Sequence, residues 1–284
     1  MIGGADYLFG VDLEDVRFMA AEGERLRDSV EHSTARYLDF LRGKGATATF
    51  FVVGDVARAY PHLVRTIAQE GHEIACHSDR HVPLDRQDRE AFRDDLLRNL
   101  DALAAAGAPA PSGYRAPCFS LTARTRWAYG VLAELGFRYS SSVLPARSPI
   151  HGWPGFGEAP RLMSGVVEIP MTLVHRRLLR LPLGGGVYFR ALPKPILRRA
   201  FARRAAGGAV PGYLHPYDIE EDQERIAFPG FSRGGIANRL LHYNRGAVFD
   251  RLEMVADLGF TFAPYGRHAE RLRPALEAGA AHGG

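Results

Sequence analysis

Short apolar runs alternate with longer amphipathic stretches along most of the chain. Residues 46–53 (ATATFFVV) are rich in β-branched and aromatic side chains, which predicts a buried strand. Residues 89–106 repeat leucine and phenylalanine at helical spacing and stop before Gly107, which predicts a helix. The same pattern predicts strands over residues 7–11, 46–53, 73–76, 113–115, 137–141, 166–170, 209–214 and 260–263, and helices over residues 26–41, 62–70, 89–106, 122–135, 195–205 and 248–258.

The order of these elements indicates a fold. Strands that alternate with helices favour parallel βα units, and the number of units predicts a single α/β domain, a distorted (β/α)7-8 barrel, over residues 1–270. Residues 271–284, which include the small-residue run AGAAHGG, are expected to form a frayed tail. In such a barrel the catalytic groups sit where the strands end, so motifs that directly follow a predicted strand are the candidates for chemistry.

Composition narrows the classes of partner. Hydrophobic residues make up 46% and charged residues 24% of the chain, as in ordinary globular proteins, and the formal net charge is +4. The arginines are spread along the chain without a nucleic-acid-binding module, so no nucleic-acid partner is expected. One basic segment, residues 194–204 (KPILRRAFARR), predicts an amphipathic helix with a solvated face, with weak peripheral contact to an anionic membrane as the alternative.

Cysteine use and the N-terminal pattern bear on the compartment. The two cysteines, Cys76 and Cys118, form no CxxC motif, and free thiols are expected. The first residues lack a basic region followed by an apolar run, and no stretch of about 18 apolar residues occurs. We therefore expect a cytoplasmic protein, whose oligomeric state the sequence does not indicate.

Polar residues follow several of the predicted strands. Asp12, Glu14 and Asp15 come after the first strand, where a negative first helical turn is the structural alternative. The segment 77–81 (HSDRH) follows the strand at 73–76 and places two histidines four residues apart, a spacing that suits a divalent metal. Arg115 and His215 end two later strands; each is alternatively an ordinary structural side chain.

Together these groups predict a metal-dependent amide hydrolase. Two imidazoles and one carboxylate make three protein ligands and leave a position open for water. A bound metal lowers the pKa of water and polarises a carbonyl group. A second carboxylate can accept the water's proton, and a histidine can protonate the leaving amine. Zn²⁺ suits this ligand set best, and Fe, Co, Ni and Mn stay open.

The motifs also resemble those of a known family. The stretches are VDLEDV, ATFFVVGDVA, GHEIACHSDRH, GYRAPCFS, FRYSSSVLP, LPLGGGVYFR and YLHPYDIE, between about residues 6 and 265. They resemble the polysaccharide deacetylase family, the nodulation-deacetylase homology domain of carbohydrate esterase family 4, and most closely its bacterial exopolysaccharide-locus members. The resemblance implies hydrolysis of an N-acetyl amide on an amino sugar, in a polysaccharide or its nucleotide- or lipid-linked precursor, with release of acetate.

The resemblance also implies a role for each matching residue. The implied roles are general base for Asp12, orientation of that base for Arg115, general acid for His215, an oxyanion-binding backbone N–H at Cys118, and metal binding for Glu14, His77 and His81.

Three positions depart from the family pattern. Glu14 stands where the family usually has aspartate, so the neighbouring Asp15 remains an alternative metal ligand. Ser140 stands where the family often has an aspartate that supports the catalytic histidine or arginine, which leaves Asp218 as an alternative support for His215. The thiol of Cys118 is unusual at its position and is expected to be idle, because no neighbouring base is evident.

The glycine-rich segment 184–190 (GGGVYFR) is expected to border the substrate, because glycines permit close approach of backbone to a ligand. Tyr188 is predicted to stack on a sugar and Arg190 to meet a carboxylate or phosphate, with a flexible connection as the alternative. Other functions stay open: a deformylase, a hydrolase of small amides or ureides, or an inactive relative that binds metal or glycan.

Overall fold

A computed structural model of the chain describes residues 4–20, 23–176, 179–224 and 235–281. Its central element is the strand that carries the first acidic motif, formed by β1 (Asp6–Leu8) and β2 (Gly10–Leu13) in succession. β1 lies parallel between β11 (Ala209–Pro211) and β12 (Thr261–Ala263), and β2 then pairs in parallel with β3 (Thr49–Val52). The side chains of this strand are buried from Tyr7 onward, which fits the unbroken apolar pattern of a strand covered on both faces.

The largest sheet has seven strands in the order β2-β3-β4-β5-β6-β8-β7. The neighbours from β2 to β8 run parallel, and β7 joins the edge antiparallel. The further strands are β4 (Glu73–Cys76), β5 (Gly113–Tyr114), β6 (Tyr139–Ser140), β7 (Arg161–Met163), β8 (Val166–Glu168) and the hairpin of β9 (Leu173–Arg176) with β10 (Leu179–Pro182).

Backbone hydrogen bonds outside the regular strand pairs link the strands across the remaining gap. Asp12 N–H donates to the carbonyl of Leu214 at 2.7 Å, and Gly186 N–H donates to the carbonyl of Tyr213 at 2.8 Å. Leu183 N–H donates to the carbonyl of Thr172 at 2.9 Å. These links replace full strand pairing on one side, so the predicted barrel is confirmed in its distorted form.

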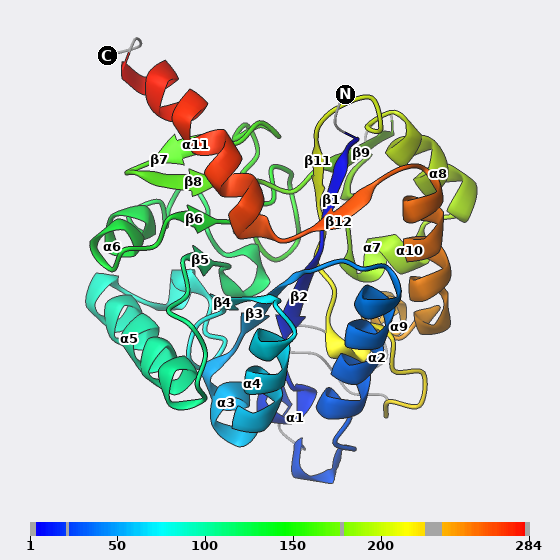
Figure 1. Cartoon of the computed structure of the whole chain (residues 1–284), viewed down its shortest axis with the longest axis horizontal. Helices are drawn as coiled ribbons and strands as arrows, with labels where there is room; N and C mark the ends of the chain where they lie inside the picture. The colour runs from blue at the N-terminus through cyan, green and yellow to red at the C-terminus, as the bar shows by residue number, and fades with distance from the viewer. Residues whose placement is uncertain (1–3, 21–22, 177–178, 225–234, 282–284) are drawn as a thin grey trace.

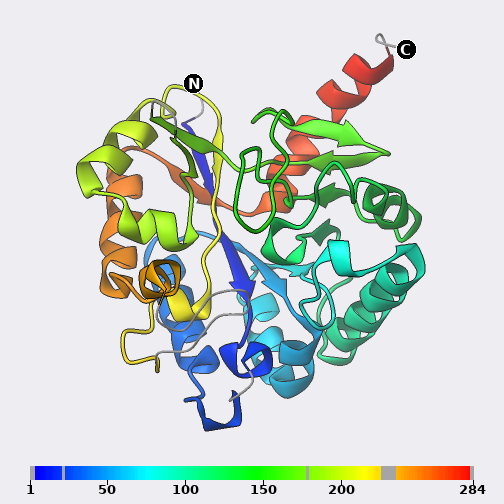
Figure 2. The ribbon, with the colours of Figure 1, turned by 180° about the vertical axis from the view of Figure 1, so that it is seen from behind.

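Helices pack around the outside of the strands (Figures 1 and 2). The α-helices are α1 (Val16–Met19), α2 (Val30–Gly43), α3 (Gly54–Ala59), α4 (Pro61–Gln69), α5 (Arg89–Ala105), α6 (Ala128–Glu134), α7 (Gly186–Ala191), α8 (Lys194–Ala202), α9 (Ile236–Leu241), α10 (Val248–Asp257) and α11 (Tyr265–Ala281). Short 3-10 helices span Gly23–Arg25, Leu84–Arg86, Pro117–Phe119, Pro216–Asp218 and Arg245–Ala247. The main core lies between these helices and the strands, and Tyr7, Phe9 and Phe262 meet there edge to face.

Several segments differ from the sequence-based prediction: α3, α7, α9 and α11 were not predicted, and the helix predicted over residues 122–135 begins only at Ala128. β7, β9 and β10 lie where no strand was predicted. Each is held by antiparallel pairing with a strand next to it in the sequence, and its side chains do not form the regular apolar pattern from which a buried strand is predicted. Residues 271–281, predicted to fray, continue α11. Leu276 packs beside the core cluster under this helix, and Arg273 Nη1 donates to the carbonyl of Gly165 at 3.0 Å, which holds the helix on the sheet edge.

The glycine-rich segment packs tightly against a neighbouring strand. A Cβ on Gly184 would lie 1.9 Å from the carbonyl oxygen of Pro211, and one on Gly185 would lie 1.7 Å from that of Tyr213. Gly186 also has a positive φ of +57°. In the structure these glycines therefore permit backbone to approach backbone, and this placement accounts for them without a ligand.

We expect Gly185→Ala to lower the free energy of unfolding by about 2 kcal/mol or more, because the added methyl group forces the barrel-closing segments apart. Urea denaturation measures the change. Gly43→Ala is the matched control: its Cβ meets nothing within 4 Å, so it should be neutral or slightly stabilising. Equal stability of the two variants would contradict the close packing.

Candidate active site

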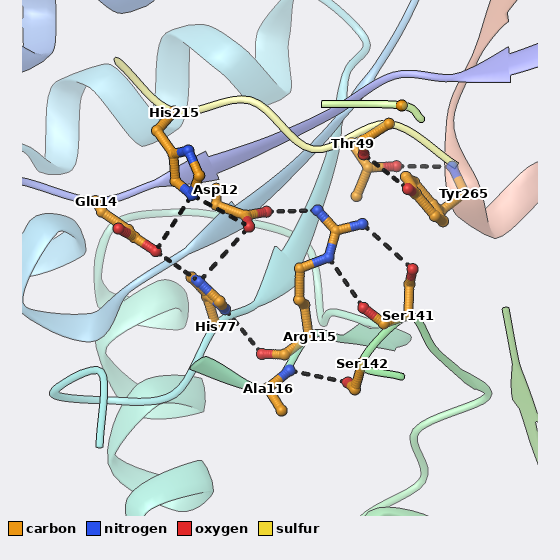
Figure 3. Close-up of polar contacts among 12 residues, drawn as sticks. Asp12, Glu14, Thr49, His77, Arg115, Ala116, Ser141, Ser142, His215 and Tyr265 are labelled. Carbon is orange, nitrogen blue, oxygen red and sulfur yellow. Dashed lines mark hydrogen bonds and ion pairs between the residues drawn. The ribbon is translucent and has the colours of Figure 1, made fainter. Parts of the chain in front are cut away.

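The residues singled out from the sequence converge at one end of the barrel. Asp12 lies on β2, and His77 and Arg115 directly follow β4 and β5. His215 follows β11 and caps the short helix Pro216–Asp218. Figure 3 shows these side chains pointing toward one another. Parallel strands end at the same edge of a barrel, which is why residues far apart in the sequence meet here.

Glu14, His77 and His81 form a compact donor set. Glu14 Oε1 lies 3.0 Å from His77 Nε2 and 2.9 Å from His81 Nε2. His77 Nδ1 lies 2.8 Å from the carbonyl oxygen of Arg115. When Nδ1 carries the proton and donates this hydrogen bond, the lone pair of Nε2 is available to a metal ion. The nearby His81 and His215 lower the pKa of Glu14 well below its usual value, despite the opposing effect of burial, which is the largest single contribution.

This donor set fits a divalent metal. One ligand atom from each of the three residues lies within 4.8 Å of the others. Within the described part of the chain His81 Nε2 is buried without a hydrogen bond, although it points at Glu14. His81 also holds a positive φ of +53°, which the surrounding structure must stabilise. The geometry therefore provides two imidazole nitrogens and a carboxylate oxygen, a set typical of catalytic metal sites.

Asp15 lies outside this set. Its carboxylate accepts the backbone N–H of Arg17 at 2.8 Å as the N-cap of α1, and it pairs with the Arg17 guanidinium at 2.7 Å. The structure thus brings Glu14, and not Asp15, to the two histidines.

Asp12 is held by Arg115. Arg115 Nη1 donates to Asp12 Oδ1 at 2.5 Å, and the fully buried guanidinium also donates from Nε to the carbonyl of Ser141 at 3.0 Å. The ring of Phe51 lies against it, 3.9 Å from the guanidinium carbon. The second Asp12 oxygen lies 3.9 Å from His77 Nε2 and 3.8 Å from His215 Nε2, between the donor set and the other histidine.

His215 is oriented by Asp218. His215 Nδ1 lies 2.8 Å from Asp218 Oδ2, which leaves Nε2 facing Asp12 and Glu14. Burial lowers the pKa of His215, but the negative charges of Asp218, Glu14 and Asp12 outweigh it and raise the pKa to about 9. A buried aspartate therefore stands in the supporting position that the sequence left open for Asp218.

Arg190 lies behind this pair. It is fully buried, its Nη2 lies 2.8 Å from Asp218 Oδ1, and its guanidinium also donates to the carbonyls of Leu241 and Tyr243. Burial raises the pKa of Asp218, but Arg190 and His215 lower it to about 2. The structure thus places Arg190 where it holds Asp218, and not at an open surface as predicted for substrate binding. Tyr188, on the same short helix, is half-buried, and its contact with a substrate stays a prediction.

Cys118 lies in the turn after Arg115 with a positive φ of +54°. Although the residue is exposed at the surface, desolvation of the thiol, followed by the nearby charge of Glu14, raises the pKa of Cys118 to about 12. The thiol is therefore protonated near neutral pH, in keeping with an idle side chain. Neither Cys118 nor the buried Cys76 forms a disulfide bond, as expected.

Serine hydroxyls occupy the region of the missing aspartate. Ser140 Oγ donates to Ser142 Oγ at 2.7 Å, and Ser142 Oγ accepts the N–H of Ala116 at 2.8 Å. Ser141 holds the Arg115 guanidinium through its carbonyl and hydroxyl groups. The sequence gives Ser141 and Ser142 no recognisable role, because their only signal is a run of serines at a strand end.

Sequence comparisons show which families and proteins the chain is similar to. Residues 27–140 match the family model "Polysaccharide deacetylase", and residues 141–266 match "Domain of unknown function (DUF3473)". A peptidoglycan-N-acetylglucosamine deacetylase of Bacillus cereus is 32% identical over 84 residues, which are 30% of each chain. A chitooligosaccharide deacetylase of Rhizobium leguminosarum bv. trifolii is 37% identical over 75 residues, 26% of this chain and 35% of that protein. The chain thus aligns with about a third of the length of these relatives.

Solved structures share the fold over nearly the whole chain. A Mycobacterium smegmatis protein described as a candidate polysaccharide deacetylase superposes with a TM-score of 0.63 at 23% identity, covering 95% of this chain and 90% of its own. A Bacillus anthracis protein described as a pseudoenzyme of carbohydrate esterase family 4 superposes with a TM-score of 0.52 at 12% identity, covering 93% and 66%. The shared fold alone therefore does not establish catalysis. The chain thus carries a polysaccharide deacetylase match over residues 27–140, followed by a match to a domain of unknown function over residues 141–266.

Proposed function

We propose that the protein is a metal-dependent hydrolase that removes the N-acetyl group from an amino sugar and releases acetate. One observation carries this proposal: the donor set of Glu14, His77 and His81 faces a carboxylate and a histidine that are each oriented by a buried partner. A protein that only binds metal or glycan has no need for such an acid and base. The deacetylases among its relatives support the same reaction.

Each residue has a distinct part in the proposed reaction. A divalent metal held by the donor set, with Zn²⁺ as the best fit, would polarise the amide carbonyl and make water more acidic. Asp12, fixed by Arg115, accepts the proton of the attacking water through the oxygen that faces the donor set. The backbone N–H of Cys118 stabilises the negative charge on the carbonyl oxygen. His215 donates a proton from Nε2 to the departing nitrogen.

Asp218 sets the pH range in which His215 can donate. A general acid must be protonated, so its activity falls as the pH rises through its pKa. We expect Asp218→Asn to remove the negative charge that raises the pKa of His215 and to move the basic limb of the kcat profile down by about one pH unit or more. Steady-state rates across pH 6 to 11 measure the shift. An unmoved or upward-shifted limb would contradict the assignment of His215 as the acid.

Acetate release tests the reaction itself. Metal-stripped protein should release no acetate, and addition of Zn²⁺ or Co²⁺ should restore release from at least one free, nucleotide-linked or polymeric N-acetylated sugar. Formate release from formamido sugars, without acetate release, would instead favour a deformylase. Stoichiometric metal binding with no release from any amide would leave the inactive relative as the better description.

The structure bears on the alternative of a lipid-linked substrate. Leu197 and Phe201 of α8 are buried in the core, and the exposed face of this helix carries Arg198, Arg199 and Arg203. In Figure 1, however, α8 lies toward the end of the barrel where β1 begins, whereas the site lies where β2 ends. A membrane bound by α8 would therefore not hold its lipids at the site, so we favour a substrate in solution.

The cellular location and the solubility of the substrate are also proposed. In the parts of the chain that the structure describes, no helix is long and apolar enough to cross a membrane. We propose a cytoplasmic protein that acts on a soluble precursor; cell fractionation with an antibody against the native protein tests this.

A further inference from the structure

Glu168 is a buried carboxylate near the site to which the reaction assigns no role. It ends β8, where it pairs in parallel register with Ser140 of β6, and its side chain is inaccessible to solvent. Glu168 Oε1 accepts the backbone N–H groups of Ser142 at 2.8 Å and Val143 at 2.9 Å. Burial raises the pKa of this carboxyl group, and the two N–H donors oppose that effect. A carboxyl group buried at this cost ties down the segment that follows β6.

That segment holds two parts of the site. The carbonyl and hydroxyl groups of Ser141 accept Nε and Nη2 of Arg115 at 3.0 and 3.3 Å, and the Ser142 hydroxyl accepts the N–H of Ala116. Figure 3 shows both serines facing the Arg115–Ala116 segment from one side. The opposite side of Arg115 faces the site: its guanidinium donates to Asp12, and its carbonyl meets His77 Nδ1.

A chain of direct contacts thus runs from Glu168 to both halves of the site. Glu168 fixes the backbone of Ser142, the adjoining serine groups fix Arg115, and Arg115 orients both the proposed base and one proposed metal ligand. The links are hydrogen bonds between buried groups, and a displaced acceptor would leave buried donors unpaired at each step.

We propose that Glu168 is a positioning residue for this site. Ser140, its partner in the strand register, has no carboxyl group, and Glu168 supplies one from β8 that holds the backbone after β6. Glu168 acts on Asp12 and His77 through Ser141, Ser142 and Arg115. The proposal rests on the proposed function for its kinetic consequence and on the geometry alone for its effect on metal binding.

Two variants separate positioning from folding. Glu168→Gln keeps an oxygen that accepts the two backbone N–H groups, whereas Glu168→Ala removes it. We expect Glu168→Ala to lower kcat by about 10- to 100-fold and to weaken Co²⁺ binding by a similar factor, the range typical of partners that orient metal ligands. Glu168→Gln should stay within about threefold of the parent protein in both measurements.

The control is a second, half-buried carboxylate at the opposite end of its strand from the site. Glu73, at the start of β4, accepts the N–H of Gly266 and the hydroxyl groups of Thr49 and Tyr139. Glu73→Ala should lower the Tm without changing kcat or Co²⁺ affinity per folded molecule. Where Glu168→Ala does not fold, Glu168→Asp, which withdraws the acceptor by one methylene, takes its place with the same expected losses.

The Co²⁺ dissociation constant and the visible spectrum of the Co²⁺ protein do not depend on the substrate. If the parent protein released no acetate, the proposed function would fail, and these two measurements would still decide the role of Glu168. Unchanged Co²⁺ affinity and spectrum in the folded acceptor-removing variant, or equal losses in Glu168→Gln and Glu168→Ala, would overturn the proposal.

Discussion

Asp12→Asn is expected to lower kcat by about 10²- to 10⁴-fold, the range typical of losing a general base. Asparagine has nearly the same shape as aspartate and keeps an oxygen that accepts Nη1 of Arg115, so the surrounding geometry should be preserved. It cannot accept a proton from water, which is why the loss should fall on kcat. The measurement is the rate of acetate release at saturating substrate, with the metal content determined on the same sample.

Metal content separates the possible outcomes of this experiment. Asp12 lies 3.9 Å from His77 Nε2 and outside the Glu14–His77–His81 set, so the variant should retain its full complement of metal. Near-parent activity in a fully loaded variant would show that another group accepts the proton. Loss of metal together with activity would show that Asp12 is a ligand and that the base has been misassigned.

Glu14→Gln is expected to weaken metal binding by more than the roughly 10- to 100-fold seen for groups that only orient a ligand. The neutral amide oxygen is a much poorer ligand than a carboxylate, and the two histidines alone cannot complete the donor set. Activity should fall in proportion to the bound metal and recover in part at high metal concentration. Isothermal titration with Zn²⁺, or with Co²⁺ followed by absorbance, measures the affinity.

Asp15→Asn is the matched control, because it makes the same chemical change one residue away. Asparagine keeps an oxygen that can cap α1 and loses only the ion pair with Arg17, so the variant should lose about 1 kcal/mol of stability at most and keep metal affinity within severalfold of the parent. If the Asp15 variant lost metal while the Glu14 variant kept it, the ligand assignment would be reversed.

The fate of Arg190 shows how burial changes the interpretation of a motif. In the sequence, an arginine after a run of glycines and a tyrosine resembles a group offered to an anionic substrate. In the structure its charge is matched by Asp218, which orients His215. Burying an arginine without a partner costs much more free energy than burying it beside an aspartate. The position of Asp218 therefore decides where Arg190 lies.

Local pattern was sufficient for most of the parallel strands and for the place where the candidate site residues meet. Apolar periodicity identified the strand at 73–76 and the helix at 89–106 nearly to the residue, because each buries a continuous face. The spacing of His77 and His81 predicted a metal site. The rule that catalytic groups of a barrel lie where its strands end predicted that Asp12, Arg115 and His215 would meet there, as they do. These features depend on residues close in sequence or on a general property of the fold.

Long-range packing decided the rest. Whether Glu14 or Asp15 reaches the histidines depends on a helix cap and on Arg17, and whether Arg190 meets a substrate depends on Asp218, which lies 28 residues further along the chain. The anchoring of Arg115 by Ser141 and of Ser142 by Glu168 crosses between neighbouring strands. Such contacts leave no periodic trace in the sequence, because a buried polar group is placed by the partner that satisfies its hydrogen bonds, and that partner is known only once the chain has folded.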